Sequence, residues 1–357
     1  MRTHTKSFTA TRSTLGRRCF KGGSDCAMVL CIRSWNASPS RWECSCSLSP
    51  TFLSFSHSQY LSICYAGVSS QTLTTIGTLL NEDLGSLFQI GWAYALGIVF
   101  AIVCCSATSG GHFNPCLTVC HVLFNKFPVA KGIRYILAQL FGAYVACLLV
   151  YAQYKVTITT IEATMSPEAL AAIQFTAKGP SGIMANYLQD GASVGLAFLN
   201  EFVVDFTIGT IIFAVTDPTN VFVPPVAVPP LIGLAYAVLI WGFGANSLGT
   251  NTARDLGGRF AALTIWGRGA VGASKGYAAI SALTNIPATV LAFLVYEFMM
   301  VDSDRVVSQA NREFHDIHAL HRRVHAAKHG HEPRLSDDDT GSSSSNEKVM
   351  VGTLERV

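Results

Sequence analysis

Two polar stretches interrupt the apolar middle of the chain, and each has an asparagine before a run that is compatible with a helix. Asn114 precedes residues 115–124, and Asn251 precedes residues 252–263. Asparagine is a good N-cap, and a helix N-terminus carries roughly +0.5 of an elementary charge. If the two N-termini faced each other, they would repel cations, and the amides could donate hydrogen bonds to a passing hydroxyl oxygen. Either stretch alone is equally well explained as an ordinary capped surface helix.

The composition places these stretches in a membrane protein. Of the 357 residues, 50% are hydrophobic and 13% are charged, whereas a soluble domain carries about 25% charged residues. The formal net charge of +3 is too small to indicate a nucleic-acid partner. A polar, charged stretch such as residues 249–259 is costly to leave in lipid, so we expect it to line a space filled with water.

Apolar segments flank both stretches, and several approach the length of about 20 residues that crosses a bilayer. The clear candidates are residues 87–106, 132–151, 194–215, 229–243 and 278–300, and a poor candidate broken by polar residues covers 51–80. Three of these spans separate Asn114 from Asn251. Because three is odd, the two stretches must enter the membrane from opposite faces, so their short helices can meet near the midplane. This is the inverted repeat in which the ends of discontinuous helices meet in a permeation path.

The two stretches resemble the signature loops of the major intrinsic protein family, the aquaporins and aquaglyceroporins. In that family the loops read Ser-Gly-x-His-x-Asn-Pro-Ala-x-Thr and Asn-Pro-Ala-Arg-Asp-Leu-Gly-Pro-Arg. The matching residues are Ser109, Gly110, His112, Asn114, Pro115 and Thr118 in the first, and Asn251, Ala253, Arg254, Asp255, Leu256, Gly257 and Arg259 in the second. The likeness runs from about residue 65 to residue 300, and the loops have a fungal character.

This resemblance implies an all-α membrane protein with six transmembrane helices plus two re-entrant half-helices in an inverted repeat. It also implies a homotetramer with one pore in each protomer, and passive flux of water and small neutral solutes. Two positions depart from the pattern, because Cys116 and Thr252 stand where the family has alanine and proline. Thr252 can still begin a helix and both asparagines remain, so we expect the proton barrier to survive. Cys116 is either a thiol open to a mercurial or, as we favour, a small buried residue.

In the family, the arginine that matches Arg254 belongs to the narrow filter, where it donates hydrogen bonds to the solute and repels cations. Counting without gaps from the two asparagines gives its partners as Tyr94, Leu248 and either Leu239 or Ile240. A filter of leucine, one aromatic ring and one arginine would suit an alcohol that carries both CH groups and hydroxyls. Each of the apolar partners is about equally well explained as packing against lipid or core.

Asp255 and Arg259 favour glycerol, because glycerol-conducting members of the family have an acid after the filter arginine and a base four residues later. Glu201 matches a buried glutamate that, in the family, accepts N–H bonds from the second loop. The resemblance thus implies a passive channel for glycerol and water that excludes ions and protons, and hydrogen peroxide is chemically plausible as a further solute. No acid occurs between Glu43 and Glu82, where an equivalent glutamate is expected. This gap motivates the alternative of a non-conducting structural relic of the same fold.

We expect three parts in the chain. Residues 1–50 are interpreted as disordered or as a mispredicted start of the coding sequence, with a transit peptide as the less favoured alternative. Residues 51–301 form the channel domain, and residues 302–357 form a polar tail. By the crossing count, the basic residues at 126–134 share a side with those after 301, and the positive-inside rule makes that side cytosolic.

These features predict an integral, multi-pass protein of the plasma membrane or of an internal, vacuolar membrane, with a cytosolic C-terminus. The sequence has no visible nucleophile–base pair, and none of its 11 cysteines has zinc-ligand spacing with histidines. We therefore predict no enzymatic activity, no cofactor and no metal. The predicted partners are the lipid bilayer, glycerol, water and hydrogen peroxide, and no nucleic acid.

Overall fold

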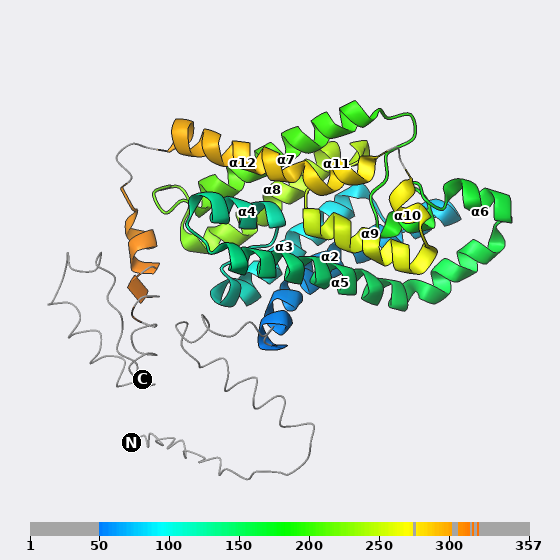
Figure 1. Cartoon of the computed structure of the whole chain (residues 1–357), viewed down its shortest axis with the longest axis horizontal. Coiled ribbons are helices and arrows are strands. Elements are labelled where there is room, and N and C mark those ends of the chain that lie inside the picture. The colour runs from blue at the N-terminus through cyan, green and yellow to red at the C-terminus, as the bar shows by residue number, and fades with distance from the viewer. Residues whose placement is uncertain (1–49, 274–275, 302–305, 315, 318–319, 321–357) are drawn as a thin grey trace, which may run out of the picture.

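The computed structural model describes residues 50–273, 276–301, 306–314, 316–317 and 320, and the regular structure within these ranges is helical (Figure 1). The principal helices are α2 (Pro50–Leu80), α3 (Leu87–Ser109), α4 (Pro115–Phe124), α5 (Val129–Thr164), α7 (Val194–Thr216), α8 (Val228–Phe243), α9 (Thr252–Trp266), α11 (Tyr277–Leu283) and α12 (Asn285–Val295), and a π-helical turn, η5 (Tyr296–Met300), continues α12. Short helices in the connections are α6 (Pro167–Ile173), η2 (Pro180–Ile183), η3 (Pro225–Ala227), η4 (Gly244–Asn246) and α10 (Gly269–Gly272). The expected N-terminal segment, apart from residue 50, and most of the expected C-terminal tail lie outside the described residues.

Five helical stretches of the described part are long and apolar enough to cross a membrane. They are Leu87–Ser106, Val129–Thr164, Val194–Thr216, Pro225–Asn246 and Tyr277–Met300, which confirms the five clear spans predicted from the sequence. The poor candidate at 51–80 forms α2, a helix of 31 residues that is not among these five. Several of its polar side chains, including Ser70, Thr72 and Thr75, are buried in the bundle. These three residues lower the hydropathy of α2 but face protein instead of lipid.

The helices pack as two interlocked halves. In the first half α2 lies along α3 and α5, and in the second half α12 lies along α7, while α3 also packs on α8. Each short helix is held by a long helix of the opposite half, because α4 packs on α12 and α9 packs on α5. The short helices α4 and α9 also contact each other, and Figure 1 shows them one after the other along the long axis of the bundle. This is the inverted arrangement that the odd number of crossings predicts.

Two adjacent glycines let α9 approach its neighbours closely. A Cβ atom at Gly257 would lie 2.5 Å from the Cβ atom of Ala143 on α5, and one at Gly258 would lie 2.2 Å from the carbonyl oxygen of Met184. Both distances are too short for non-bonded heavy atoms, so only glycine fits at these two positions. The close approach brings the backbone after η2 against the first turns of α9, which carry Arg254.

Candidate functional site

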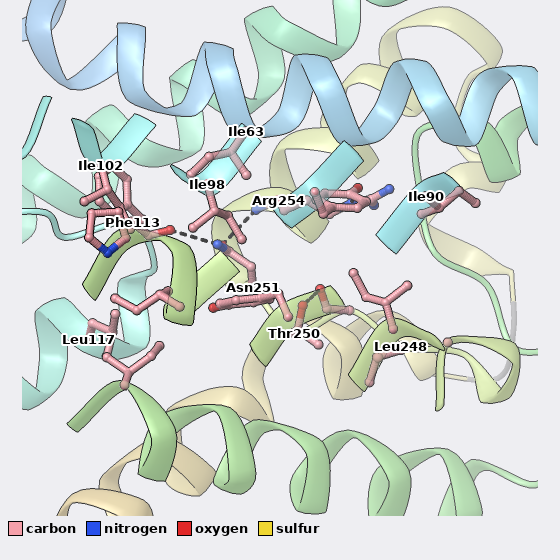
Figure 2. Close-up of a pocket in the computed structure, with 18 of the residues that line it drawn as sticks. Ile63, Ile90, Ile98, Ile102, Phe113, Leu117, Leu248, Thr250, Asn251 and Arg254 are labelled. Carbon is pink, nitrogen blue, oxygen red and sulfur yellow. Dashed lines mark hydrogen bonds between the residues drawn. The ribbon is translucent and has the colours of Figure 1, made fainter. Parts of the chain in front are cut away.

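The two asparagines cap the two short helices and bridge the two loops. Asn114 accepts a hydrogen bond from Cys116 N at 3.3 Å, and Asn251 accepts from Ala253 N at 2.9 Å and from Arg254 N at 3.2 Å. The amide of Asn114 donates to the Thr250 carbonyl, and the amide of Asn251 donates to the Phe113 carbonyl, both at 2.8 Å. Figure 2 shows the second of these bonds. Each amide is therefore fixed both by its own helix and by the opposite loop.

A cavity of about 1130 Å³ lies within the bundle beside this junction. Along α3 its wall extends from Leu87 to Ser106, a distance of about 28 Å at a rise of about 1.5 Å per residue. That length is close to the hydrocarbon thickness of a bilayer, about 30 Å. Much of the middle of the wall is apolar, and Figure 2 shows Ile98 near Asn251 and Ile102 near Phe113.

The two asparagines are not placed equally with respect to this cavity. Asn251 lines it, whereas Asn114 is 2% exposed and is not among the described residues on its wall. Tyr236 of α8 lines the cavity and lies close to Asn114. Asn251 and Tyr236 therefore line the cavity at this level, and Asn114 does not.

Arg254 lies on the cavity wall and is held by three acceptors from three parts of the chain. Its Nε donates to the Tyr94 hydroxyl at 2.9 Å, its Nη1 to the Met184 carbonyl at 3.0 Å and its Nη2 to Gln71 Oε1 at 2.7 Å. The side chain is buried, with 4% of the residue exposed. Because guanidinium is planar and its donors are fixed in direction, three acceptors determine its orientation.

The expected partners of Arg254 lie on the same wall, apart from Leu239. Tyr94 and Leu248 line the cavity, and so does Ile240. Leu239, the alternative to Ile240 in the sequence, is instead buried in the apolar cluster that includes Ile208, and it is not among the described lining residues. Adjacent residues on a helix point about 100° apart, so Leu239 and Ile240 face different neighbours.

Glu201 of α7 holds the loop that leads into α9. Its carboxyl oxygens accept hydrogen bonds from Gly249 N at 2.8 Å and from Thr250 N at 2.6 Å. Thr250 has a φ of 55°, which a β-branched residue rarely adopts. The Thr250 carbonyl in turn accepts from Asn114, so Glu201 stabilises a strained backbone that positions the first asparagine.

The two positions that depart from the family pattern are both buried. Thr252 occupies the first position of α9, as Pro115 does in α4. The Thr252 hydroxyl donates to Asn285 Oδ1 of α12 at 2.7 Å. Asn285 also donates to Asn114 Oδ1 at 3.4 Å. The threonine thus has a buried partner in the last long helix, which a proline could not have. Cys116 is 3% exposed, and the described cavity wall does not include it.

Asp255 and Arg259 form a buried ion pair away from the cavity wall. Arg259 Nη2 lies 3.2 Å from Asp255 Oδ1, and the two residues are 3% and 0% exposed. The same nitrogen donates to the Asn186 carbonyl at 2.7 Å, and Asn186 Nδ2 donates to Asp255 Oδ1 at 3.3 Å. The Tyr187 ring lies 5.5 Å from the guanidinium, and burial raises the pKa of this phenol. The pair therefore contacts the loop that carries Met184, whose carbonyl accepts from Arg254.

His112 supports the first loop from behind. It is 6% exposed and stacks on His121, with ring centroids 4.3 Å apart. Its carbonyl accepts a hydrogen bond from Gln139 of α5. Among the described residues there is no group of three or more His, Cys, Asp or Glu side chains that could hold a metal ion.

Four residues of the site were missed by the sequence analysis: Gln71, Met184, Asn186 and Asn285. Gln71 and Asn285 carry a signal, because each is a strongly polar residue within a helix that packs in a membrane bundle. Met184 and Asn186 serve partly or wholly through their backbone carbonyls. A carbonyl is common to every residue type, so the sequence carries no comparable signal for them.

Comparison with known proteins gives a family model, relatives in sequence and a solved structure of similar fold. Residues 52–271 match the family model described as Major intrinsic protein. An aquaporin of Laccaria bicolor is 48% identical over 291 residues, which is 80% of this chain and 86% of the relative. The Glycerol uptake facilitator protein of Haemophilus influenzae is 32% identical over 185 residues, 51% of this chain and 68% of the relative. The X-ray structure of the aquaglyceroporin from Plasmodium falciparum superposes with a TM-score of 0.58 at 21% identity, covering 70% of this chain and 97% of that chain, and this likeness shows the fold.

Proposed function

The chain belongs to the major intrinsic protein family, and from this premise we propose that it is a passive channel for both glycerol and water that excludes ions and protons. Family membership and the apolar helices make it an integral, multi-pass membrane protein and a channel for water or glycerol. The proposal concerns which solutes pass and how they are selected. Arg254, Tyr94, Leu248 and Ile240 are proposed to form the filter, and Asn251 the central polar contact.

The observation that carries the proposal is the mixed character of the wall around Arg254. A guanidinium has five N–H donors, of which three bond to acceptors among the described residues. The remaining two can donate to the hydroxyl groups of a solute. Ile240 and Leu248 supply apolar surface on the same wall, which suits the CH groups of a polyol. A fixed positive charge in a narrow passage also disfavours cations.

One relative supports glycerol as a solute, because it carries the name Glycerol uptake facilitator protein. Asp255 and Arg259 add to this support, since the buried pair fixes the loop whose Met184 carbonyl orients Arg254. The proposal extends to hydrogen peroxide as a small hydroxylic solute, to a homotetramer, and to a cytosolic C-terminus in a plasma or vacuolar membrane.

A non-conducting structural relic of the fold is the second candidate. It is favoured by the lack of an acidic residue in α2, since Glu201 braces the second loop and α2 offers no equivalent carboxyl for the first. It is also favoured by the position of Asn114, which is not among the described residues that line the cavity, whereas Asn251 is. On this view the fold would persist while the path no longer passes solutes.

The test is the uptake of isotope-labelled glycerol into cells that express the chain. Uptake should exceed that of cells with an empty vector, and it should not change when an uncoupler dissipates the proton gradient. Ile98→Trp should abolish the excess because Ile98 lines the cavity, whereas Leu96→Trp on the 46% exposed outer face of α3 should retain it. Uptake that the uncoupler abolishes would indicate active transport. No excess uptake from correctly inserted protein would favour the relic.

A further inference from the structure

We propose that Gln71 of α2 is a positioning residue of the pore, which sets the glycerol-to-water selectivity by holding the Arg254 guanidinium against the wall. The inference rests on the proposed function, since it concerns how the same pore selects its solutes. Gln71 lines the cavity beside Arg254. It comes from the helix whose sequence gives the poorest membrane span, and its polarity is one cause of that poor signal.

Both ends of the Gln71 amide are engaged. Its Oε1 accepts from Arg254 Nη2 at 2.7 Å, and its Nε2 donates to the Gly182 carbonyl at 2.8 Å. Since one partner is a donor and the other an acceptor, the amide has one favourable orientation. The Gly182 backbone is itself tightly packed, because a Cβ there would lie 2.6 Å from the Thr176 carbonyl oxygen. Gln71 therefore connects Arg254 to a rigid turn.

Gln71 differs from the other polar residues on its face of α2. Gln71, Thr74, Thr75 and Thr78 all line the cavity, at the spacing that places side chains on one face of a helix. The hydroxyls of Thr74 and Thr78 donate to carbonyls of their own helix at 3.1 Å and 3.0 Å. They give the wall polarity without restraining another element, whereas Gln71 reaches α9 and the η2 turn.

The consequence for selectivity follows from the geometry of the guanidinium. With Gln71 in place, Nη2 has a protein acceptor and the planar group lies along the wall. Without that acceptor, an additional buried N–H must find a partner, and the nearest alternatives are molecules in the cavity. We expect the side chain to turn towards the passage, which obstructs glycerol more than the smaller water molecule.

The experiment compares three variants in reconstituted vesicles by stopped-flow light scattering under glycerol and water gradients. Gln71→Met keeps the length of the side chain and removes the acceptor, and it should lower the glycerol-to-water permeability ratio by about tenfold, the order of effect for a hydrogen bond to a charged group. Gln71→Glu restores an acceptor for Arg254 and should recover most of the ratio. Ser69→Ala removes a hydroxyl of the same helix that donates to the Ala66 carbonyl and is not among the described lining residues, so it should leave the ratio unchanged. A wild-type ratio in Gln71→Met, or an equal fall in Ser69→Ala, would overturn the inference.

A second measurement does not depend on flux. Phenylglyoxal modifies arginine guanidinium groups, and the rate at Arg254 can be followed by peptide mass spectrometry on the intact purified protein. The rate should rise in Gln71→Met and stay near that of the wild type in Gln71→Glu and Ser69→Ala. Equal rates in Gln71→Met and the wild type would refute the role of Gln71. Wild-type vesicles that pass neither solute would instead contradict the proposed function, and the modification rate would still decide the inference.

Discussion

Removal of the Glu201 carboxyl should destabilise the protein by leaving two buried N–H groups without an acceptor. Glu201 is fully buried and accepts from Gly249 N and Thr250 N. An unsatisfied buried donor costs about 1–3 kcal/mol, so Glu201→Ala should lower the free energy of unfolding by about 2–6 kcal/mol. Glu201→Gln keeps one acceptor oxygen, so its cost should be about half as large, roughly 1–3 kcal/mol.

Asp205, one helical turn later on α7, provides a matched control. It is also buried, and its Oδ2 has no hydrogen-bond partner among the described residues. Asp205→Asn should therefore cost little or be stabilising, because the substitution removes a partly unpartnered carboxyl from an apolar site.

The assay is the midpoint of thermal unfolding of the purified protein in detergent, where 1 kcal/mol corresponds to about 2–4 °C for a domain of this size. The midpoint should fall in the order Asp205→Asn, Glu201→Gln, Glu201→Ala, with the alanine variant lowest. Thr250 should also leave its left-handed conformation, so water and glycerol fluxes should fall with the midpoint. If Glu201→Ala unfolded at the wild-type temperature, the two bonds to the loop would not be stabilising and the reasoning would be wrong.

Three further predictions follow from the buried contacts around α9. Arg259→Met leaves the Asp255 carboxylate buried without its counter-charge, so it should lower the free energy of unfolding by about 3–5 kcal/mol, and adding Asp255→Leu should recover part of this loss. An unchanged melting midpoint in the single variant would contradict the ion pair. Thr252→Val removes the donor to Asn285 and should lower the free energy of unfolding by about 1–3 kcal/mol, while Thr252→Ser should melt like the wild type. Equal losses of stability in both variants would show that the hydroxyl does not stabilise the protein. Cys116→Ala should change neither flux nor any inhibition by a mercurial, because Cys116 is 3% exposed; loss of inhibition in stopped-flow measurements would place this thiol in the path.

Local signals in the sequence account for much of the fold. Asn114 and Asn251 are caps that act within one helical turn, and α4 and α9 begin directly after them. The apolar segments are long, and the odd number of spans between the asparagines follows from counting alone. Glu201 was identified through the family pattern, and it contacts the loop that the pattern implies.

Other features depend on geometry that the sequence does not encode locally. Between α8 and α9 the chain passes through η4 and through positive φ values at Ser247 and Thr250. Spacing across such a segment does not determine which face of α8 meets the cavity, so Leu239 and Ile240 could not be separated. Helix α5 extends to Thr164, well past the apolar segment that ends at residue 151, because helix formation continues beyond lipid while hydropathy records only the apolar part.

The most direct test of the account is the temperature dependence of glycerol and water permeability in vesicles that contain the wild-type chain. Stopped-flow light scattering should give rates above those of protein-free vesicles for both solutes, with a low activation energy and no change in internal pH as the solutes move. Such a result would establish a pore that carries glycerol and water past Arg254 and excludes protons. Rates equal to those of protein-free vesicles, with the chain inserted and folded, would contradict the account and favour the non-conducting relic.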